Sequence, residues 1–269
     1  MQVYRPNIFK EHIRDEKLLW LDKNENINEN LLKFIKKKTT LTKEIISAYP
    51  NLSTTYIKLA NFYNVNKYSL LLSHGSDGGI QNVFQALIKK NNLVILSSPT
   101  FAMYDVYSKA FDAKITYIKY IHNQKGKISL DLNSLFKVLK KKPKLLCLPN
   151  PDSPTGSIID EKTLNQIIKL CNKIGCYVLI DEAYHLYYEK SQIKKINQYN
   201  NLIIVKSFSK AFGLAGLRAG CLISNIETIK YLKSFKPMYE INHFCAEVLN
   251  TIFTKKGIEI VKRSINETK

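Results

Sequence analysis

Lys210 lies among residues whose types and spacing suit the binding of a phosphorylated carbonyl compound. The segment 205–220 has the pattern of a buried strand leading into a loop of small residues, and Ser207 and Ser209 precede the lysine. An amine is nucleophilic only when neutral, and the apolar surroundings predict a lysine with little access to water. Arg218 has the planar fork that binds phosphate. These residues predict pyridoxal 5'-phosphate (PLP) as the ligand, because PLP carries an aldehyde and a phosphate.

Asp181 and Tyr184 follow another apolar stretch, and each has two readings. Asp181 could simply cap the turn that follows its strand. Near an aldehyde cofactor, a buried carboxylate would instead stabilise the protonated pyridine nitrogen, which keeps the ring an electron sink. Tyr184 could be a core residue, or its hydroxyl could hydrogen-bond to the phenolic oxygen of the cofactor.

Three further segments could contribute to the same site. Ser76 and Asp77 lie in a glycine-containing turn that opens a helix, so the backbone N–H groups there would favour a phosphate. The same turn could be only a tight connection. Phe101 could stack on a ring or belong to the core, and Ser153 begins a Ser-Pro-Thr-Gly turn.

The order of the elements places these residues together. Apolar strands without alternation, joined by amphipathic helices, predict an α/β fold with a mostly parallel sheet covered by helices on both faces. Ligands of such sheets bind beyond the carboxyl ends of the strands, where each candidate residue follows its strand. We expect a polar turn over 74–79 and one long helix over 244–261. The expected strands are 69–73, 93–96, 115–118, 145–148, 177–180 and 202–205, and the main helices are 80–88, 102–111, 132–139 and one capped by Asp160.

Composition narrows the class of protein. With 269 residues and 45% hydrophobic content, the chain can bury a large core. The net charge of +19 comes from lysines spread along the chain without interleaved aromatics, which favours a biased composition over a nucleic-acid surface. Five cysteines without a close CxxC pair, and histidines without ligand spacing, predict neither a disulfide framework nor a metal site. We expect a cytoplasmic protein with no signal peptide and no membrane span.

Several segments together resemble the class I/II aminotransferases of fold type I, and within them the histidinol-phosphate aminotransferases and the related threonine-phosphate decarboxylases. The matching segments run in the family's order, from Trp20-Leu21 and Asn24-Glu25 through Tyr49-Pro50 to 75–77, 99–101, 151–156, 181–184 and 207–218.

The resemblance implies a role for each candidate residue. Lys210 forms the Schiff base with PLP and then moves the proton. Asp181 and Tyr184 hold the pyridine nitrogen and the phenolic oxygen. Tyr49 reaches a phosphate across the interface of a homodimer. The phosphate-binding residues are Ser76, Asp77, Ser207, Ser209 and Arg218.

Three features depart from the family pattern. Ser153 stands where an asparagine usually binds the phenolic oxygen, and Phe101 stands where the stacking residue is often tyrosine. The chain ends at Lys269, without the small C-terminal lobe and its carboxylate-binding arginine, and Arg263 does not match that motif.

The expected organisation is an N-terminal arm over 1–50, a PLP-binding large domain over 51–240, and a long interdomain helix beginning a largely missing small domain over 241–269. The implied function is transfer of an amino group between an amino acid, such as histidinol phosphate or a similar compound, and a 2-oxo acid. Decarboxylation of an amino-acid phosphate, or a truncated cofactor-binding module without turnover, are the alternatives.

Overall fold

The computed structural model describes residues 23–122, 126–188 and 190–268, so the motif at Trp20-Leu21 lies outside the described residues. Its centre is an eight-stranded sheet. The strands are β1 (Leu70–His74), β2 (Leu93–Ser98), β3 (Lys114–His122), β4 (Ile128–Leu130), β5 (Leu145–Pro149), β6 (Tyr177–Asp181), β7 (Leu202–Ser207) and β8 (Ala219–Ile223).

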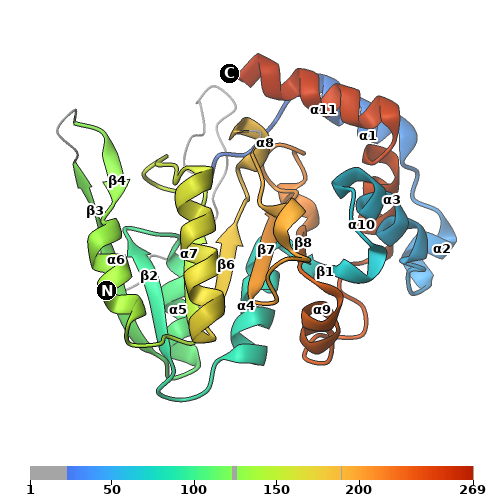
Figure 1. Cartoon of the computed structure of the whole chain (residues 1–269). Coiled ribbons are helices and arrows are strands. Elements are labelled where there is room, and N and C mark those ends of the chain that lie inside the picture. Colours follow the sequence, from blue (N-terminus) through green and yellow to red (C-terminus); the bar gives the residue numbers. More distant parts are fainter. Residues whose placement is uncertain (1–22, 123–125, 189, 269) are drawn as a thin grey trace, which may run out of the picture.

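Helices surround this sheet (Figure 1). They are α1 (Glu29–Lys38), α2 (Lys43–Ser47), α3 (Ser53–Tyr63), α4 (Gly75–Leu87), α5 (Ala102–Ala110), α6 (Leu132–Leu139), α7 (Glu161–Ile174), α8 (His185–Tyr188), α9 (Ile226–Lys233), α10 (His243–Ile252) and α11 (Lys255–Thr268). None of the helices within the described residues has both the length and the apolar character needed to cross a bilayer.

The sheet has the strand order β1-β8-β7-β6-β5-β2-β3-β4, and its central pairs are parallel. Strand β8 runs antiparallel to both neighbours, so β1 points the same way as β7. Strands β1, β2, β5, β6 and β7 therefore all end at one edge of the sheet. This edge is where the candidate residues were expected to meet.

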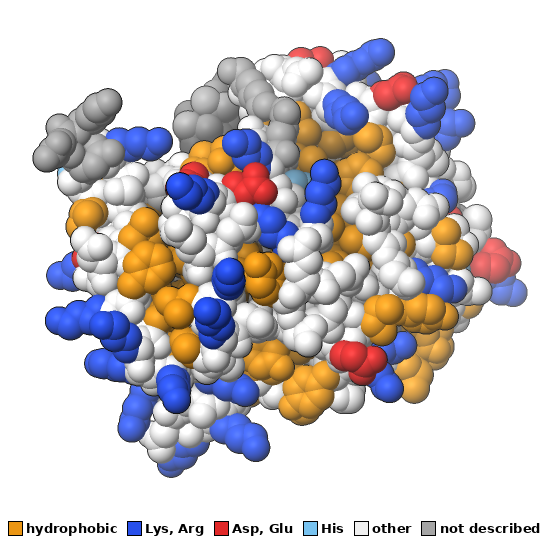
Figure 2. All heavy atoms as spheres, viewed as in Figure 1, with side chains coloured by type: hydrophobic (Ala, Val, Ile, Leu, Met, Phe, Trp, Pro, Cys, Tyr) orange, Lys and Arg blue, Asp and Glu red, His pale blue; other side chains and the backbone are white. Residues whose placement is uncertain are grey.

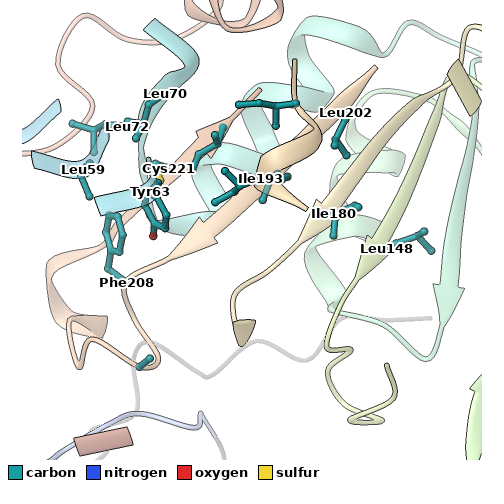
Figure 3. Close-up of a cluster of buried hydrophobic side chains, with 14 of the residues drawn as sticks. Leu59, Tyr63, Leu70, Leu72, Leu148, Ile180, Ile193, Leu202, Phe208 and Cys221 are labelled. Atoms are coloured by element: carbon teal, nitrogen blue, oxygen red, sulfur yellow. The ribbon is translucent and has the colours of Figure 1, made fainter. Parts of the chain in front are cut away.

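Each face of the sheet carries its own apolar core, which confirms the expected α/β architecture. On one face α4, α5 and α9 pack on residues such as Leu179 and Val205. On the other face α3, α6, α7 and α10 pack on a larger cluster, part of which is shown in Figure 3 from Leu59 of α3 to Leu148 of β5. Strands buried on both faces explain the continuous apolar runs of the sequence.

The predicted turn over 74–79 is wrong, because α4 already begins at Gly75. Its polar, glycine-rich start resembled a turn, but close packing requires these small residues. Gly75 has a φ of +72°, and a Cβ on Gly220 of β8 would lie 2.6 Å from the backbone nitrogen of Ser76. The first turn of α4 thus lies against β8, a strand that the sequence pattern did not reveal.

The predicted long helix over 244–261 is also wrong, because the chain turns between α10 and α11. Thr254 donates its hydroxyl hydrogen to the carbonyl of Thr251 and accepts the N–H of Gly257. A Cβ on Gly257 would lie 2.3 Å from the carbonyl oxygen of Ile252, so only glycine allows α11 to start so close to α10. After this turn α11 packs beside α1 (Figure 1).

Lysine and arginine side chains are spread over the face shown in Figure 2, where they alternate with apolar and uncharged side chains. On this face they do not gather into one basic patch.

A buried ion pair joins the ends of β6 and β7 on the face opposite α4. Lys206 donates to Glu182, and both side chains are almost fully buried, with 1% and 2% exposed. Glu182 also accepts the Ser191 hydroxyl at 2.6 Å and the Gln192 N–H at 2.8 Å. Lys206 holds the pKa of Glu182 below its usual value despite burial, so the carboxylate is charged.

We expect Lys206→Met to lower the free energy of unfolding by about 3–5 kcal/mol, because it leaves a buried carboxylate without its cation. In the double variant Lys206→Met with Glu182→Leu, the free energy of unfolding should fall clearly less, since no unpaired charge remains. Urea unfolding of both variants measures this difference. Equal losses in the single and double variants would show that packing, not charge, dominates at this position.

Candidate active site

A cavity of about 520 Å³ opens at the carboxyl edge of the sheet. Every candidate residue except Tyr49 lines it, although the residues come from segments far apart in the chain. The candidate residues in its wall are Ser76, Asp77, Phe101, Ser153, Asp181, Tyr184, Ser207, Ser209, Lys210 and Arg218.

One end of the cavity has the donors of an anion site. Gly75, Ser76 and Asp77 form the first turn of α4, whose backbone N–H groups lack helical partners. The Arg218 guanidinium lies against this turn, since a Cβ on Gly75 would be 2.9 Å from its Nη2 atom. The Asp77 carboxylate accepts the Tyr107 hydroxyl at 2.9 Å, which leaves the backbone of Asp77 as its contribution to anion binding.

Ser207 and Ser209 complete this end from the loop after β7. Both are mostly buried, and the Ser207 hydroxyl oxygen accepts the N–H of Ser209 at 3.2 Å. Arg218 has a φ of +52°, an uncommon conformation for a side chain of its size, and Nη1 donates to the Ala215 carbonyl at 3.4 Å. Two hydroxyls, a helix start and a guanidinium suit a doubly charged phosphate.

Asp181 lies in the floor of the cavity at the end of β6. The Tyr104 hydroxyl donates to its Oδ2 at 3.0 Å and the Ala183 N–H donates to its Oδ1 at 2.9 Å. Burial raises the pKa of Asp181 to about 6, although both hydrogen bonds oppose that rise. A cationic N–H donor placed beside this carboxylate would stabilise its charged form.

Lys210 is half-buried, which differs from the expected exclusion of water. Its apolar neighbours Phe208, Ala211 and Phe212 pack into the core and leave the lysine at the cavity wall. The Nζ atom donates to the carbonyl of Lys23 at 2.6 Å and lies 5.7 Å from the centre of the Tyr184 ring.

The Tyr184 hydroxyl accepts the side-chain amide of Asn24 at 3.1 Å. The segment 23–25 thus forms part of the cavity wall next to the lysine.

Phe101 and Ser153 lie in the cavity wall on loops that follow β2 and β5. The Phe101 side chain is 38% exposed in the cavity wall, and its ring is nearly perpendicular to that of Tyr104 with centres 6.0 Å apart. The loop that carries Ser153 is held by Asp152, which accepts the backbone N–H of Thr155 at 3.0 Å.

Tyr49 lies outside the cavity. Its side chain is 79% exposed and stacks on Tyr239 with ring centres 4.5 Å apart. The structure holds one chain, so the role of Tyr49 across a dimer interface stays a prediction.

Tyr104 is a site residue that sequence reasoning missed. It is fully buried on α5 and supplies the hydroxyl bound to Asp181. A signal was present, because Tyr104 and Tyr107 follow Phe101 at intervals of three residues, which places all three on one side of a helix.

The residues in the cavity fit PLP. The glycines at 75 and 220 allow Arg218 and β8 to lie against the start of α4, where Ser76 and Asp77 line the cavity. The buried Asp181 lines the same cavity and suits a partner that donates a ring N–H. No group of three or more His, Cys, Asp or Glu side chains able to hold a metal occurs within residues 23–122, 126–188 and 190–268.

The model of the family "Aminotransferase class I and II" matches residues 16–264. The chain belongs to the class I and II aminotransferases. Among curated members, the histidinol-phosphate aminotransferase of Thermoanaerobacter sp. strain X514 is 35% identical, covering 90% of this chain and 69% of the relative. That of Methanocaldococcus jannaschii is 31% identical, covering 85% and 61%. The chain therefore spans roughly two thirds of the length of these relatives.

Solved structures of the family share the fold. Histidinol-phosphate aminotransferase from Sinorhizobium meliloti, in complex with PLP, superposes with a TM-score of 0.79 at 17% identity, covering 91% of this chain and 66% of that one. The L-threonine-O-3-phosphate decarboxylase from Porphyromonas gingivalis gives a TM-score of 0.68 at 20% identity, covering 84% and 68%. At these identities the likeness shows the fold alone.

We expect Tyr104→Phe to raise the pKa of Asp181 further above its ordinary value, because the hydroxyl that stabilises the carboxylate is removed. A titration of the aspartate carboxyl carbons by NMR measures the shift. Tyr107→Phe is the matched control, since its hydroxyl bonds to Asp77. An unchanged Asp181 midpoint in Tyr104→Phe would contradict this hydrogen bond.

Proposed function

We propose that this chain binds PLP through Lys210 and transfers an amino group between an amino acid and a 2-oxo acid. The observation that carries the proposal is that one cavity contains an amine, a buried carboxylate and an end suited to bind an anion. Membership of the aminotransferase family supports it.

Each residue has a defined task in this proposal. Bound PLP supplies a ring that withdraws electrons from the carbon bearing the transferred amino group. Asp181 accepts the ring N–H, and its buried carboxylate keeps that nitrogen protonated. The Lys210 amine holds the cofactor before substrate arrives and afterwards moves a proton at the substrate carbon. The start of α4 with Ser76 and Asp77, together with Ser207, Ser209 and Arg218, binds the phosphate.

The remaining residues orient the ring. Phe101 packs on one ring face, and Tyr184 donates to the phenolic oxygen. Ser153 can donate to the same oxygen, with a shorter side chain than the asparagine common in the family. In the present structure the Tyr184 hydroxyl accepts from Asn24, which leaves its own hydrogen free to be donated.

For the substrate we propose histidinol phosphate or a similar amino compound, because curated relatives are named histidinol-phosphate aminotransferases. The decarboxylase alternative has its support in the fold of the Porphyromonas protein. A cofactor-binding module without turnover is the third alternative, since the chain spans about two thirds of its relatives.

We expect borohydride treatment of the protein with PLP to fix the cofactor on Lys210, with Lys210→Ala unmodified at this position. Peptide mass spectrometry identifies the modified residue. Lys23→Ala is the matched control, because it removes another lysine of the cavity wall and keeps the backbone carbonyl that accepts from Lys210. Cofactor attached elsewhere, with Lys210 untouched, would overturn the proposal.

The reaction class is assayed with the same protein. Turnover of histidinol phosphate that requires a 2-oxo acid supports transamination, whereas release of carbon dioxide from an amino-acid phosphate supports the decarboxylase. PLP bound on Lys210 with neither product formed supports the module without turnover.

We also propose a homodimer in the cytoplasm. The stacked Tyr49 and Tyr239 are exposed, and so are their sequence neighbours Ile46 and Met238, at 75% and 80%. Exposed apolar side chains that form a patch mark association sites. For the cytoplasmic location, the support is that the five cysteines are unpaired and buried, which accords with a reducing compartment.

For the domains, we propose an arm over 1–50, a large domain over 51–240 and the beginning of a small domain over 241–269.

We expect sedimentation to give twice the chain mass of 31.0 kDa, and Tyr49→Ala with Met238→Ser to weaken this dimer. The control is Ile121→Ser on β3, near the other end of the sheet and 46% exposed. A wild-type chain that sediments as a monomer at micromolar concentration would refute the dimer.

A further inference from the structure

We propose that Asn26 is a positioning residue for Lys210, holding the loop that carries the lysine so that its amine faces the cofactor. This inference rests on the proposed function. The pair Asn24-Glu25 belongs to the segments that resemble the family, and the roles proposed above leave the next residue, Asn26, unused.

The Asn26 side chain joins three distant parts of the chain. Its Nδ2 atom donates to the carbonyl of Ala211, the residue after Lys210, at 3.0 Å. The same atom donates to the Ser264 hydroxyl of α11 at 2.7 Å. Its Oδ1 atom accepts the N–H of Asn28 at 3.1 Å, which fixes the orientation of the amide.

The backbone of Asn26 also restrains the lysine loop. A Cβ on Gly213 would lie 2.9 Å from the Asn26 carbonyl oxygen, so the two backbones are in close contact. Gly213 has a φ of +67°, and its N–H donates to the Lys210 carbonyl at 3.0 Å. The turn 210–213 thus has Asn26 on one side, while its apolar side chains Ala211 and Phe212 are buried on the other.

The placement of the Lys210 amine depends on the loop that carries it, because the lysine lies at the cavity wall and not in the core. The lysine is half-buried, its Nζ atom donates to the Lys23 carbonyl in the segment that contains Asn26, and it lies 5.7 Å from the centre of the Tyr184 ring. Small misplacements of a reacting group cost large factors in rate. Loss of the hydrogen bond to the Ala211 carbonyl should therefore slow the reaction of the Lys210 amine with PLP more than it lowers the affinity of the cavity for the cofactor.

The variants separate these effects. Asn26→Asp keeps the shape and the acceptor for Asn28 but removes both donors, and Asn26→Ala removes the donors without adding charge. Asn28→Asp is the matched control. It adds the same charge two residues away and keeps the oxygen that caps α1. It replaces the hydrogen bond to Glu267 of α11 with repulsion between two carboxylates, a disturbance at α11 outside the lysine loop.

The experiment uses the full chain with PLP, and borohydride stops samples at timed intervals so that mass spectrometry gives the rate of attachment to Lys210. We expect both Asn26 variants to slow attachment roughly tenfold or more, and Asn28→Asp to stay within about twofold of wild type. A PLP analogue with a methyl group in place of the aldehyde cannot react with the Lys210 amine. Its binding therefore measures the affinity of the cavity alone. Its affinity should change little in any variant.

Three results would overturn the inference: wild-type attachment rates in both Asn26 variants, an equal slowing by Asn28→Asp, or a parallel loss of analogue affinity that indicates a general structural role. If wild-type protein attaches no PLP at Lys210, the proposed function itself fails. That result differs from failure of the Asn26 inference, which requires normal attachment in the wild type.

Discussion

Parallel pairing of β5, β6 and β7 places the ends of three buried strands at one edge of the sheet. In the register Pro149 pairs with Asp181, and Asp181 pairs with Val205, two residues before Ser207. Because side chains alternate along a strand, Asp181, Val205 and Ser207 face the same side. The distance between the acid and the phosphate end of the cavity therefore follows from strand pairing, and rigid strands keep it constant.

The same alternation sends Glu182 and Lys206 to the opposite face. A buried ion pair contributes little net stability, because removal of two charges from water costs about as much as their attraction returns. Its position next to Asp181 and Ser207 suggests why it is present. The pair, with Ser191 and the Gln192 N–H, adds side-chain contacts at the last residues of β6 and β7. There the Glu182 N–H still donates to the Val205 carbonyl at 3.0 Å.

Close backbone contacts shape the remainder of the cavity. Gly220 lets β8 approach the first turn of α4, so that the unpaired N–H groups of this turn and the Arg218 guanidinium reach the same end of the cavity. Gly213 similarly allows the segment with Asn26 to lie against the lysine loop. A side chain at either position would separate the two segments, so both ends of the cavity depend on glycine.

The sequence by itself determined the α/β class, most strands and the set of residues at the carboxyl edge. Apolar runs are local patterns, and the rule that parallel strands end at one edge turns these patterns into a shared location for Asp181, Ser207 and Lys210. Their individual chemical roles remain predictions.

Only the tertiary structure decided the start of α4, the turn between α10 and α11, and the partners Tyr104 and Asn26. These features arise from contacts between segments as far apart as Asn26 and Ser264, and local periodicity carries no information about such contacts. Gly75 and Gly257 show the difference in opposite ways. The glycine-rich segment at Gly75 predicted a turn and instead begins a helix, whereas Gly257 lay within a predicted helix and instead follows a turn.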